Sequence, residues 1–375
     1  MKILFTGGGT GGHFYPIIGV AQAMRDISKE EKLLDQDLYF VAPDPYNEKI
    51  LFDNLITYKK VPAGKIRHYF SIMNFFDLFK TSYGILKAMW TVFWIYPDVI
   101  FSKGGYGSFP VVLAGRFLRI PIIIHESDST PGKVNKWAGK FAEKVAVSYP
   151  EAEKFFDSEK VAWTGNPIRK EISHVVKDGA AEYLDLEDNL SVILVLGGSQ
   201  GSELINEAVI DALPKLIDNY QIIHQTGKEK FDLVKNTANV VMGQSKNKYR
   251  YHPFAYLDDL AMKMSAGAAD IIITRAGSTL FEIATWEKPC IIVPITKSNR
   301  DHQKVNAYTY ARFGGGTVIE ERNLTDDIII FEINRILTNE NVRNKMIEGA
   351  KKFAKKDAAR TIAKEILETA LKHQK

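Results

Sequence analysis

Glycines crowd the sequence Leu4-Phe5-Thr6-Gly7-Gly8-Gly9-Thr10-Gly11-Gly12-His13-Phe14-Tyr15-Pro16, which lies between a predicted β-strand, Met1 to Phe5, and a predicted helix, Phe14 to Met24. Without Cβ atoms, such a turn can adopt positive φ and bring its backbone close to a ligand. Its N–H groups then converge at a helix N-terminus, whose partial positive charge favours an anion. The sequence therefore predicts that this turn binds a phosphate or diphosphate group.

The same pattern returns in the second half of the chain, at Leu196-Gly197-Gly198-Ser199-Gln200-Gly201-Ser202. It follows the apolar run Ile193 to Leu196 and precedes a helical pattern, Leu204 to Leu216. Two glycine turns in equivalent positions indicate two similar halves. The six-residue dinucleotide fingerprint with its downstream acidic partner is not clearly present after either strand. An NAD-dependent oxidoreductase that uses the first glycine turn stays an alternative.

Length and composition describe an ordinary folded protein. A chain of 375 residues is longer than a domain with a single hydrophobic core usually is, so two domains are expected. The formal charge of +4 is too small to argue for nucleic acid as a partner. Cys290 is the only cysteine, which excludes an internal disulfide and fits a reducing compartment; we interpret it as a buried hydrophobic residue. No signal peptide is expected before the first strand, which predicts a cytoplasmic protein.

Short apolar strands alternate with helical segments along most of the chain. The clearest predicted strands are 38–41, 99–101, 120–124, 145–147, 161–163, 192–196, 221–224, 271–274, 291–294 and 316–319. We interpret the acidic stretch Lys170 to Asn189 as a linker and Val342 to His373 as helical. The expected fold class is α/β, with two Rossmann-like open parallel sheets that face one another across a cleft and bind ligands at the carboxyl ends of their strands. The expected domains are 1–166 and 167–345, followed by a C-terminal helix, 346–375, that can pack back on the first domain.

The segment Phe70 to Tyr96 has more apolar surface than one buried face of a helix needs. Its apolar residues follow three-and-four spacing, and Lys65, Arg67, His68, Lys80 and Lys87 lie in or next to the apolar arc. Asp77 and the lysines interrupt the run too often for a transmembrane helix. Two interpretations remain open: a crossover helix buried in the fold, or a helix whose excess aromatic surface and basic fringe enter an anionic membrane.

Several residues are candidates for chemistry. A third glycine turn, Ser102-Lys103-Gly104-Gly105-Tyr106-Gly107-Ser108, follows a strand of the first domain and could line one anion site with the first turn. His13 lies where the first glycine loop becomes a helix, so its ring is expected to be neutral near pH 7. It could be a general base, a phosphate hydrogen-bond donor or a capping side chain.

The second half offers a matching set. In Thr274-Arg275-Ala276-Gly277-Ser278-Thr279-Leu280-Phe281-Glu282, the N–H groups of Gly277, Ser278 and Thr279 could hold a phosphate, and Glu282 suits ribose hydroxyls. Asp301-His302-Gln303 with Asn306 adds amide groups for sugar hydroxyls, or a helix cap at Asp301. The sequence has no Cys/His spacing typical of a metal site and no serine nucleophile elbow, so no metal is expected. The remaining possibility is catalysis by positioning of the substrates together with one general base.

A series of motifs in this chain resembles the MurG family, the UDP-N-acetylglucosamine transferases of peptidoglycan synthesis in glycosyltransferase family 28. The matching motifs are Gly7 to Pro16, Gly104 to Tyr106, His125 to Gly132 with Asn135 and Lys136, Thr164 to Arg169, Gly197 to Gly201, His224 to Lys228, Arg275 to Ser278, and Asp301 to Gln303 with Asn306. They occur in order and cover nearly the whole chain.

The resemblance implies a GT-B fold with an N-terminal acceptor domain and a C-terminal nucleotide-sugar domain. The implied reaction is inverting transfer of N-acetylglucosamine from UDP-GlcNAc onto the 4-hydroxyl of the muramoyl sugar of lipid I, giving lipid II and UDP. It also implies a peripheral protein at the cytoplasmic face of the bacterial membrane, with the helix after Phe70 against the anionic inner leaflet. No cofactor is required, although Mg²⁺ could assist as a free counter-ion. The resemblance leaves the oligomeric state unknown.

The resemblance also assigns roles to residues. His13 is the implied base; the substrate-binding positions are Thr10, Gly11, Gly12, Tyr106, Glu126, Asp128, Asn135, Arg169, Ser199, Gln200, Leu257, Gly277, Ser278, Thr279, Glu282, Gln303 and Asn306. Arg169 and Ser199 would contact the nucleotide's phosphates, the backbone near Leu257 the uracil edge, and Glu282 the ribose.

Two departures from the family pattern stand out. Asp128 occupies a position where many relatives have Asn, and His125 or Lys136 could offset its charge. The spacing from Arg275 to Glu282 is one residue shorter than usual. Alternatives with the same fold are a diacylglycerol or sterol glycosyltransferase and a binding protein without activity.

Overall fold

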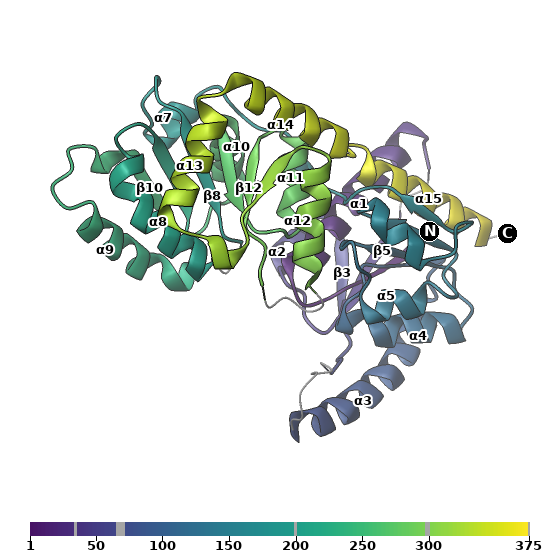
Figure 1. Cartoon of the computed structure of the whole chain (residues 1–375). Coiled ribbons are helices and arrows are strands. Elements are labelled where there is room, and N and C mark those ends of the chain that lie inside the picture. Colours follow the sequence, from purple (N-terminus) through teal and green to yellow (C-terminus); the bar gives the residue numbers. More distant parts are fainter. Residues whose placement is uncertain (34–35, 65–71, 199–200, 297–300, 374–375) are drawn as a thin grey trace. The chain divides into compact units, whose positions relative to one another are not determined.

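The chain folds into two compact units. The computed structural model describes residues 1–33, 36–64, 72–198, 201–296 and 301–373. One unit comprises Met1–Arg169 with Lys355–Lys375, and the other comprises Lys170–Ala354. Both boundaries lie later in the chain than the expected ones, after residues 166 and 345. We call the two parts unit 1 and unit 2 and describe each separately (Figure 1).

Unit 1 is built on a seven-stranded parallel sheet with the strand order β3-β2-β1-β4-β5-β6-β7. Its strands are β1 (Lys2–Thr6), β2 (Asp37–Ala42), β3 (Ile56–Lys60), β4 (Val99–Ser102), β5 (Ile122–Glu126), β6 (Lys144–Val147) and β7 (Val161–Trp163). Because successive side chains of a strand alternate between faces, Ile3 and Phe5 enter one core and Leu4 enters the other. The expected parallel sheet is confirmed, and the half-polar edge strand β3 was not predicted.

Helices cover both faces of this sheet, as parallel strands require. The helices of unit 1 are α1 (Gly11–Glu30), α2 (Glu48–Asp53), α3 (Ile72–Ile95), α4 (Phe109–Phe117), α5 (Lys133–Ala138) and α15 (Ala358–His373), with short 3₁₀ turns at η1 (Tyr106–Ser108) and η2 (Pro150–Phe155). Residues of α1 and α15 pack on the Ile3 face. Residues of α3, α4 and α5 pack on the Leu4 face.

The C-terminal segment crosses from unit 2 to unit 1. The helical prediction for Val342 to His373 is confirmed, but the stretch forms two helices: α14 (Glu340–Phe353) ends in unit 2, and α15 begins after a short break. Just after the break, Lys355 Nζ lies 3.9 Å from the centroid of the Trp163 ring. Helix α15 then packs on α1 (Figure 1). Its residues Ile362 and Ile366 are buried in the core.

Unit 2 repeats the architecture with a six-stranded parallel sheet in the order β10-β9-β8-β11-β12-β13. Its strands are β8 (Val192–Leu196), β9 (Gln221–Gln225), β10 (Tyr251–Phe254), β11 (Ile271–Thr274), β12 (Cys290–Ile292) and β13 (Gly316–Val318). Its helices are α6 (Lys170–Ser173), α7 (Ala180–Leu184), α8 (Glu203–Leu216), α9 (Phe231–Val241), α10 (Asp259–Ala268), α11 (Thr279–Thr285), α12 (His302–Arg312), α13 (Asp326–Leu337) and α14. Cys290 is fully buried, as predicted.

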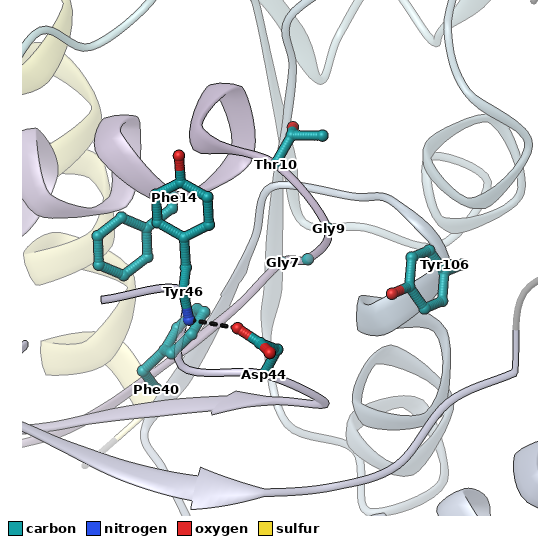
Figure 2. Close-up of a pocket in the computed structure, with 9 residues that line it drawn as sticks. Gly7, Gly9, Thr10, Phe14, Phe40, Asp44, Tyr46 and Tyr106 are labelled. Atoms are coloured by element: carbon teal, nitrogen blue, oxygen red, sulfur yellow. Dashed lines mark hydrogen bonds between the residues drawn. The ribbon is translucent and has the colours of Figure 1, made fainter. Parts of the chain in front are cut away.

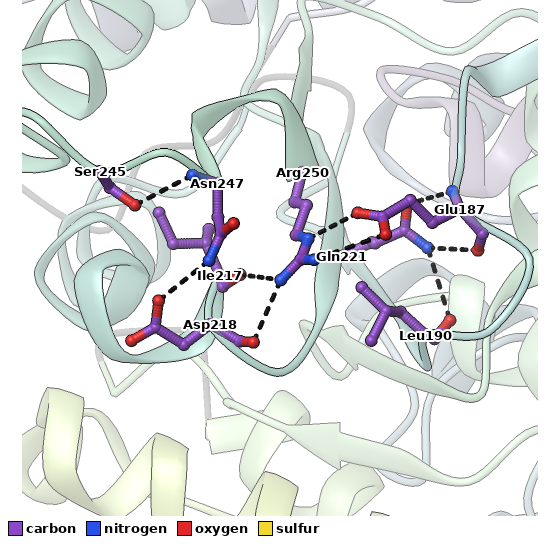
Figure 3. A network of polar contacts seen from close by, with 8 residues as sticks. All are labelled: Glu187, Leu190, Ile217, Asp218, Gln221, Ser245, Asn247 and Arg250. Carbon is purple, nitrogen blue, oxygen red and sulfur yellow. Dashed lines mark hydrogen bonds and ion pairs between the residues drawn. The ribbon is translucent and has the colours of Figure 1, made fainter.

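The stretch from Lys170 to Asn189 is not a linker, contrary to expectation. It forms α6 and α7, and both pack on α10. Glu187 anchors its end, because its carboxylate accepts a hydrogen bond from Arg250 Nε at 2.6 Å. The Gln221 side chain also accepts from the Glu187 N–H and donates to the Glu187 carbonyl (Figure 3). These contacts make the acidic stretch part of unit 2.

Helix α3 confirms the predicted helical segment and leaves much of its apolar surface exposed. Ala88, Val92 and Ile95 are buried against the rest of unit 1. From residue 77 onward, where the side chains are described, the exposed apolar residues of the helix and its C-terminus are Leu78, Phe79, Tyr83, Leu86, Trp90, Phe93, Trp94 and Tyr96, which we call the α3 aromatic face. Lys65, Arg67, His68 and Phe70 lie outside the described residues. None of the described helices is long and apolar enough to span a membrane.

Candidate functional site

The first glycine loop joins β1 to α1 as predicted. Gly9 has a φ of 96°, which explains the need for glycine there. Thr10 is the N-cap of α1 without a side-chain cap bond, so the helix begins at Gly11 with N–H groups that have no intrahelical acceptor. A cavity of about 260 Å³ lies against this loop. It is lined by Gly7, Gly8, Gly9, Thr10, Phe14, Phe40, Asp44, Tyr46 and Tyr106 (Figure 2).

A second glycine loop lies next to the first, because β4 pairs directly with β1. Gly104 and Gly105 have φ values of 79° and 80° and lead into the turn that carries Tyr106. A Cβ at Gly104 would lie 2.6 Å from the side-chain amide of Asn135, and one at Gly105 would lie 3.5 Å from His13 Nε2. The two loops therefore lie side by side, as predicted, and their role as one anion site stays a prediction.

His13 occupies the first turn of α1 and is partly exposed. Its Nδ1 lies 3.0 Å from Thr10 Oγ1. The pKa of His13 is lowered from 6.5 to about 4, chiefly by desolvation and then by the Lys103 ammonium, while Asp128 opposes the shift. The ring is therefore neutral near pH 7, as expected from its place at a helix N-terminus. A base acting through Nε2 requires the tautomer in which Nδ1–H donates to Thr10.

Glu126 and Asn135 shape the loop that follows β5. The buried Glu126 carboxylate accepts hydrogen bonds from the N–H groups of Asp128 and Gly132, both at 3.0 Å, and from Asn135 Nδ2 at 2.9 Å. Burial raises the pKa of Glu126. These hydrogen bonds fix the loop that places Asp128 near His13. Glu126 and Asn135 can therefore influence ligand binding indirectly, by setting the conformation of this loop.

Lys103 is the functional candidate that sequence reasoning missed. Its ammonium is almost fully buried and donates to His125 Nδ1 at 2.6 Å, to Ser127 Oγ and, at 3.4 Å, to Asn166 Oδ1. Burial lowers the pKa of Lys103 to about 7, against the pull of Glu126 and Asp128. The available signal was a lone lysine placed directly between an apolar strand and a glycine pair.

The expected offset of Asp128 by His125 is wrong. Desolvation and the Lys103 charge hold the pKa of His125 well below its ordinary value, so its ring is neutral. Lys136, the other expected cation, lies 5.6 Å from the Phe155 ring centroid. Lys103 is a cation that interacts electrostatically with Asp128.

In unit 2, the turn after β8 is held by side chains from its neighbours. Gly198 and Gly201 have positive φ, whereas Ser199 and Gln200 lie outside the described residues. Arg275, directly after β11, donates to the Ser202 hydroxyl that caps α8 and pairs with Glu321 at 2.7 Å. The Leu257 N–H, expected near a uracil edge, donates to Gln225 Oε1 at 3.0 Å.

The remaining predicted residues of unit 2 surround the turn after β11. Ser278 and Thr279 open α11, and Glu282 lies in its first turn. A Cβ at Gly277 would meet nothing within 4 Å, so there is open space beside this backbone. The neighbouring α12 carries two amides: Asn306 Nδ2 donates to the Ala276 carbonyl at 3.3 Å, and Gln303 Oε1 accepts from the Ile295 N–H at 3.2 Å.

The structure thus groups the predicted residues by unit. At the carboxyl ends of β1, β4 and β5 it gathers Thr10, Gly11, Gly12, His13, Tyr106, Glu126, Asp128 and Asn135. Arg169 ends the first segment of unit 1, and its guanidinium lies 4.3 Å from the Tyr15 ring centroid. Within the described ranges no group of three His, Cys, Asp or Glu residues could hold a metal ion.

Sequence comparisons match both halves of the chain. Residues 3–147 match the glycosyltransferase family 28 N-terminal domain, and residues 192–362 match the glycosyltransferase family 28 C-terminal domain. A protein of Bacillus thuringiensis (strain Al Hakam) is 35% identical over 370 residues, which cover 98% of this chain and 99% of that protein. It is named UDP-N-acetylglucosamine--N-acetylmuramyl-(pentapeptide) pyrophosphoryl-undecaprenol N-acetylglucosamine transferase 3. A Clostridium botulinum (strain Hall) protein of the same enzyme name is 34% identical, covering 93% of this chain and 96% of its own.

Structural comparisons agree on the fold. The crystal structure of Acinetobacter baumannii MurG has a TM-score of 0.73 at 22% identity and covers 98% of this chain and 99% of its own. A UDP-GlcNAc 2-epimerase from Neisseria meningitidis, bound to UDP-GlcNAc, has a TM-score of 0.69 at 14% identity, covering 99% and 100%. The GT-B fold class expected from the sequence is confirmed.

Proposed function

This chain belongs to the family of UDP-N-acetylglucosamine--N-acetylmuramyl-(pentapeptide) pyrophosphoryl-undecaprenol N-acetylglucosamine transferases, and we infer from this membership that it transfers N-acetylglucosamine from UDP-GlcNAc to the muramoyl sugar of lipid I. The observation that carries the inference is the near-complete alignment with relatives of that name. The paired glycine loops of unit 1 support the acceptor side of the reaction, because α1 begins at the first loop and a helix N-terminus favours a diphosphate.

The neutral His13 ring is our candidate for the general base. The acceptor hydroxyl must lose its proton as it attacks the anomeric carbon, and Nε2 can accept that proton when Nδ1–H donates to Thr10. With a pKa of about 4, the His13 ring is by itself a weak base. A bound diphosphate adds negative charge, which raises the pKa of a nearby imidazole and strengthens the base. The acceptor itself would then tune the group that activates it.

Unit 2 is our candidate for the nucleotide-sugar site. The leaving group is UDP, whose growing negative charge needs preorganised N–H donors. Gly277, Ser278 and Thr279 offer such donors beside open space, and Glu282 can accept from ribose hydroxyls one helical turn later. We propose that catalysis needs no tightly held metal and that Mg²⁺ assists only as a free counter-ion of the diphosphate. We also propose that the two units close over both substrates.

The α3 aromatic face is our candidate for the membrane contact. Trp90 and Trp94 are 66% and 65% exposed, and their rings lie next to each other on one side of the helix. Aromatic side chains with a nearby lysine, here the exposed Lys80, suit the interface of an anionic bilayer. A lipid-linked acceptor requires the protein to reach that interface. We therefore propose a peripheral protein at the cytoplasmic leaflet of the bacterial membrane.

Acceptor competition tests the proposed function. The purified protein, with UDP-GlcNAc, is given a lipid I analogue or diacylglycerol, and UDP release is measured. We expect release with lipid I and none with diacylglycerol; the reverse result would assign the fold to another lipid acceptor. Calorimetry with UDP-GlcNAc, UDP-glucose and NAD measures which donor the protein binds. Binding of NAD without binding of either UDP-sugar would contradict the proposal.

Vesicle binding tests the membrane contact. We compare the native protein with the double variant Trp90→Ser and Trp94→Ser on vesicles with and without anionic lipid. Because burying each tryptophan contributes roughly 2 kcal/mol, the double variant should lose about 4 kcal/mol and bind about a thousandfold more weakly. The matched control is Phe331→Ser, which removes an aromatic ring that is 64% exposed on α13 of unit 2. Equal losses in both variants would contradict the assignment of the α3 aromatic face.

A further inference from the structure

We propose that Lys103 is a positioning residue of the transfer reaction: its buried ammonium offsets the carboxylate of Asp128 and thereby keeps the His13 ring able to accept a proton. The inference rests on the proposed function, because His13 matters here as the candidate base. It assigns a role to a side chain that joins the ends of β4 and β5 to the segment after β7.

The contacts of Lys103 specify its charge. Its Nζ has three acceptors, one each from His125, Ser127 and Asn166. Only the ammonium form has three hydrogens to donate. His125 must accept at Nδ1, so its own proton lies on Nε2, which faces the Gly165 carbonyl at 3.0 Å. The imidazole is thus neutral, and the positive charge of this cluster is on Lys103.

The place of Lys103 in the loops explains why that charge reaches the candidate base. A Cβ at Gly7 would lie 3.0 Å from Lys103 Cβ, so the lysine stem packs directly against the first glycine loop. Ser127, which accepts from its ammonium, immediately precedes Asp128. The lysine therefore touches both loops that flank His13.

Opposite charges act on the His13 ring. Lys103, from the loop after β4, favours the neutral ring, and Asp128, from the loop after β5, favours the protonated one. His125 interacts with His13 but is neutral, and Glu126 is held by its own loop. An aspartate beside His13 would by itself hold a proton on the base and repel a diphosphate. Lys103 removes both effects.

Two single variants separate this role from a general structural one, because they should move the same titration in opposite directions. Lys103→Met keeps the length of the stem and removes the charge, so the acid limb of kcat/KM should shift upward by about one pH unit. Asp128→Asn removes the carboxylate, and the limb should shift downward by about half a unit. The double variant should return toward the native profile.

A second readout does not depend on activity. The His13 ring is titrated by NMR in histidine-labelled protein without substrate, and its signal is assigned with His13→Gln. The same opposite shifts are expected, so an inactive native protein would contradict the proposed function while this titration still tests Lys103. Shifts in the same direction for both variants, or an unchanged His13 titration in both, would overturn the proposal.

Discussion

Replacing Gly104 with alanine should destabilise unit 1, and the structure allows the decrease in the free energy of unfolding to be estimated. Alanine at a φ of 79° costs about 1–2 kcal/mol in backbone strain. The new Cβ would lie 2.6 Å from the Asn135 amide, which would have to move. Asn135 would then lose its bonds to the His125 carbonyl and the Glu126 carboxylate, at about 1 kcal/mol each. The expected decrease in the free energy of unfolding is about 3–4 kcal/mol.

Gly132→Ala is the matched control. Gly132 has a φ of −62° and nothing within 4 Å of an added Cβ, so its free energy of unfolding should stay within about 0.5 kcal/mol of the native value. Unfolding in urea is followed by tryptophan fluorescence, while thiol labelling of Cys290 reports unit 2 separately. Equal stability of the Gly104 and Gly132 variants would refute the idea that Asn135 fixes the loops around His13.

Three further predictions concern unit 2. The buried His224 has its pKa lowered to about 3 by desolvation, so the unfolded chain binds a proton that the native one does not. Native stability should therefore decrease by roughly 2 kcal/mol between about pH 7 and pH 5 for this group, and denaturant melts of His224→Gln should lack that part of the slope. Arg275→Lys should destabilise unit 2 by about 1–3 kcal/mol, because a lysine cannot keep the two guanidinium hydrogen bonds to the Val293 carbonyl and the Ser202 hydroxyl. Lys215→Met removes an exposed ion pair and should change stability by less than about 0.5 kcal/mol. Equal effects of the two variants in calorimetry would contradict this prediction. Burial raises the pKa of the Cys290 thiol, so a thiol reagent should label it only upon unfolding, and rapid labelling of the native protein would contradict its burial.

The strand-to-helix turns were predictable from local sequence. An apolar run, glycines and a helical period follow one another directly at both β1 and β8, and the backbone follows that order. The edge strand β3 was missed because its burial alternates weakly, with Ile56 buried and most other positions exposed. The break before α15 was missed because Ala354 to Asp357 contains neither glycine nor proline. Hydrophobic periodicity thus identifies the buried strands and helices, but it does not identify edge strands or helix ends as well.

The electrostatics of the site could not be predicted in the same way. Lys103 meets partners that are far away in sequence, His125 and Asn166, and only the order of the strands brings them together. Burial then reverses the expectation for His125, whose ring is neutral where a cation was anticipated. Sequence motifs thus located the loops, whereas the charges within them depend on desolvation in the folded state.

Transfer by His13→Ala is the most direct measurement of the central claim, that an imidazole at the first glycine loop activates the acceptor. Turnover with UDP-GlcNAc and a lipid I analogue is compared with the native protein, and UDP affinity is measured by calorimetry on both. Loss of a general base predicts turnover lower by about 10²–10⁴-fold with UDP affinity unchanged. Near-normal turnover, or a loss explained by weaker UDP binding, would contradict the account.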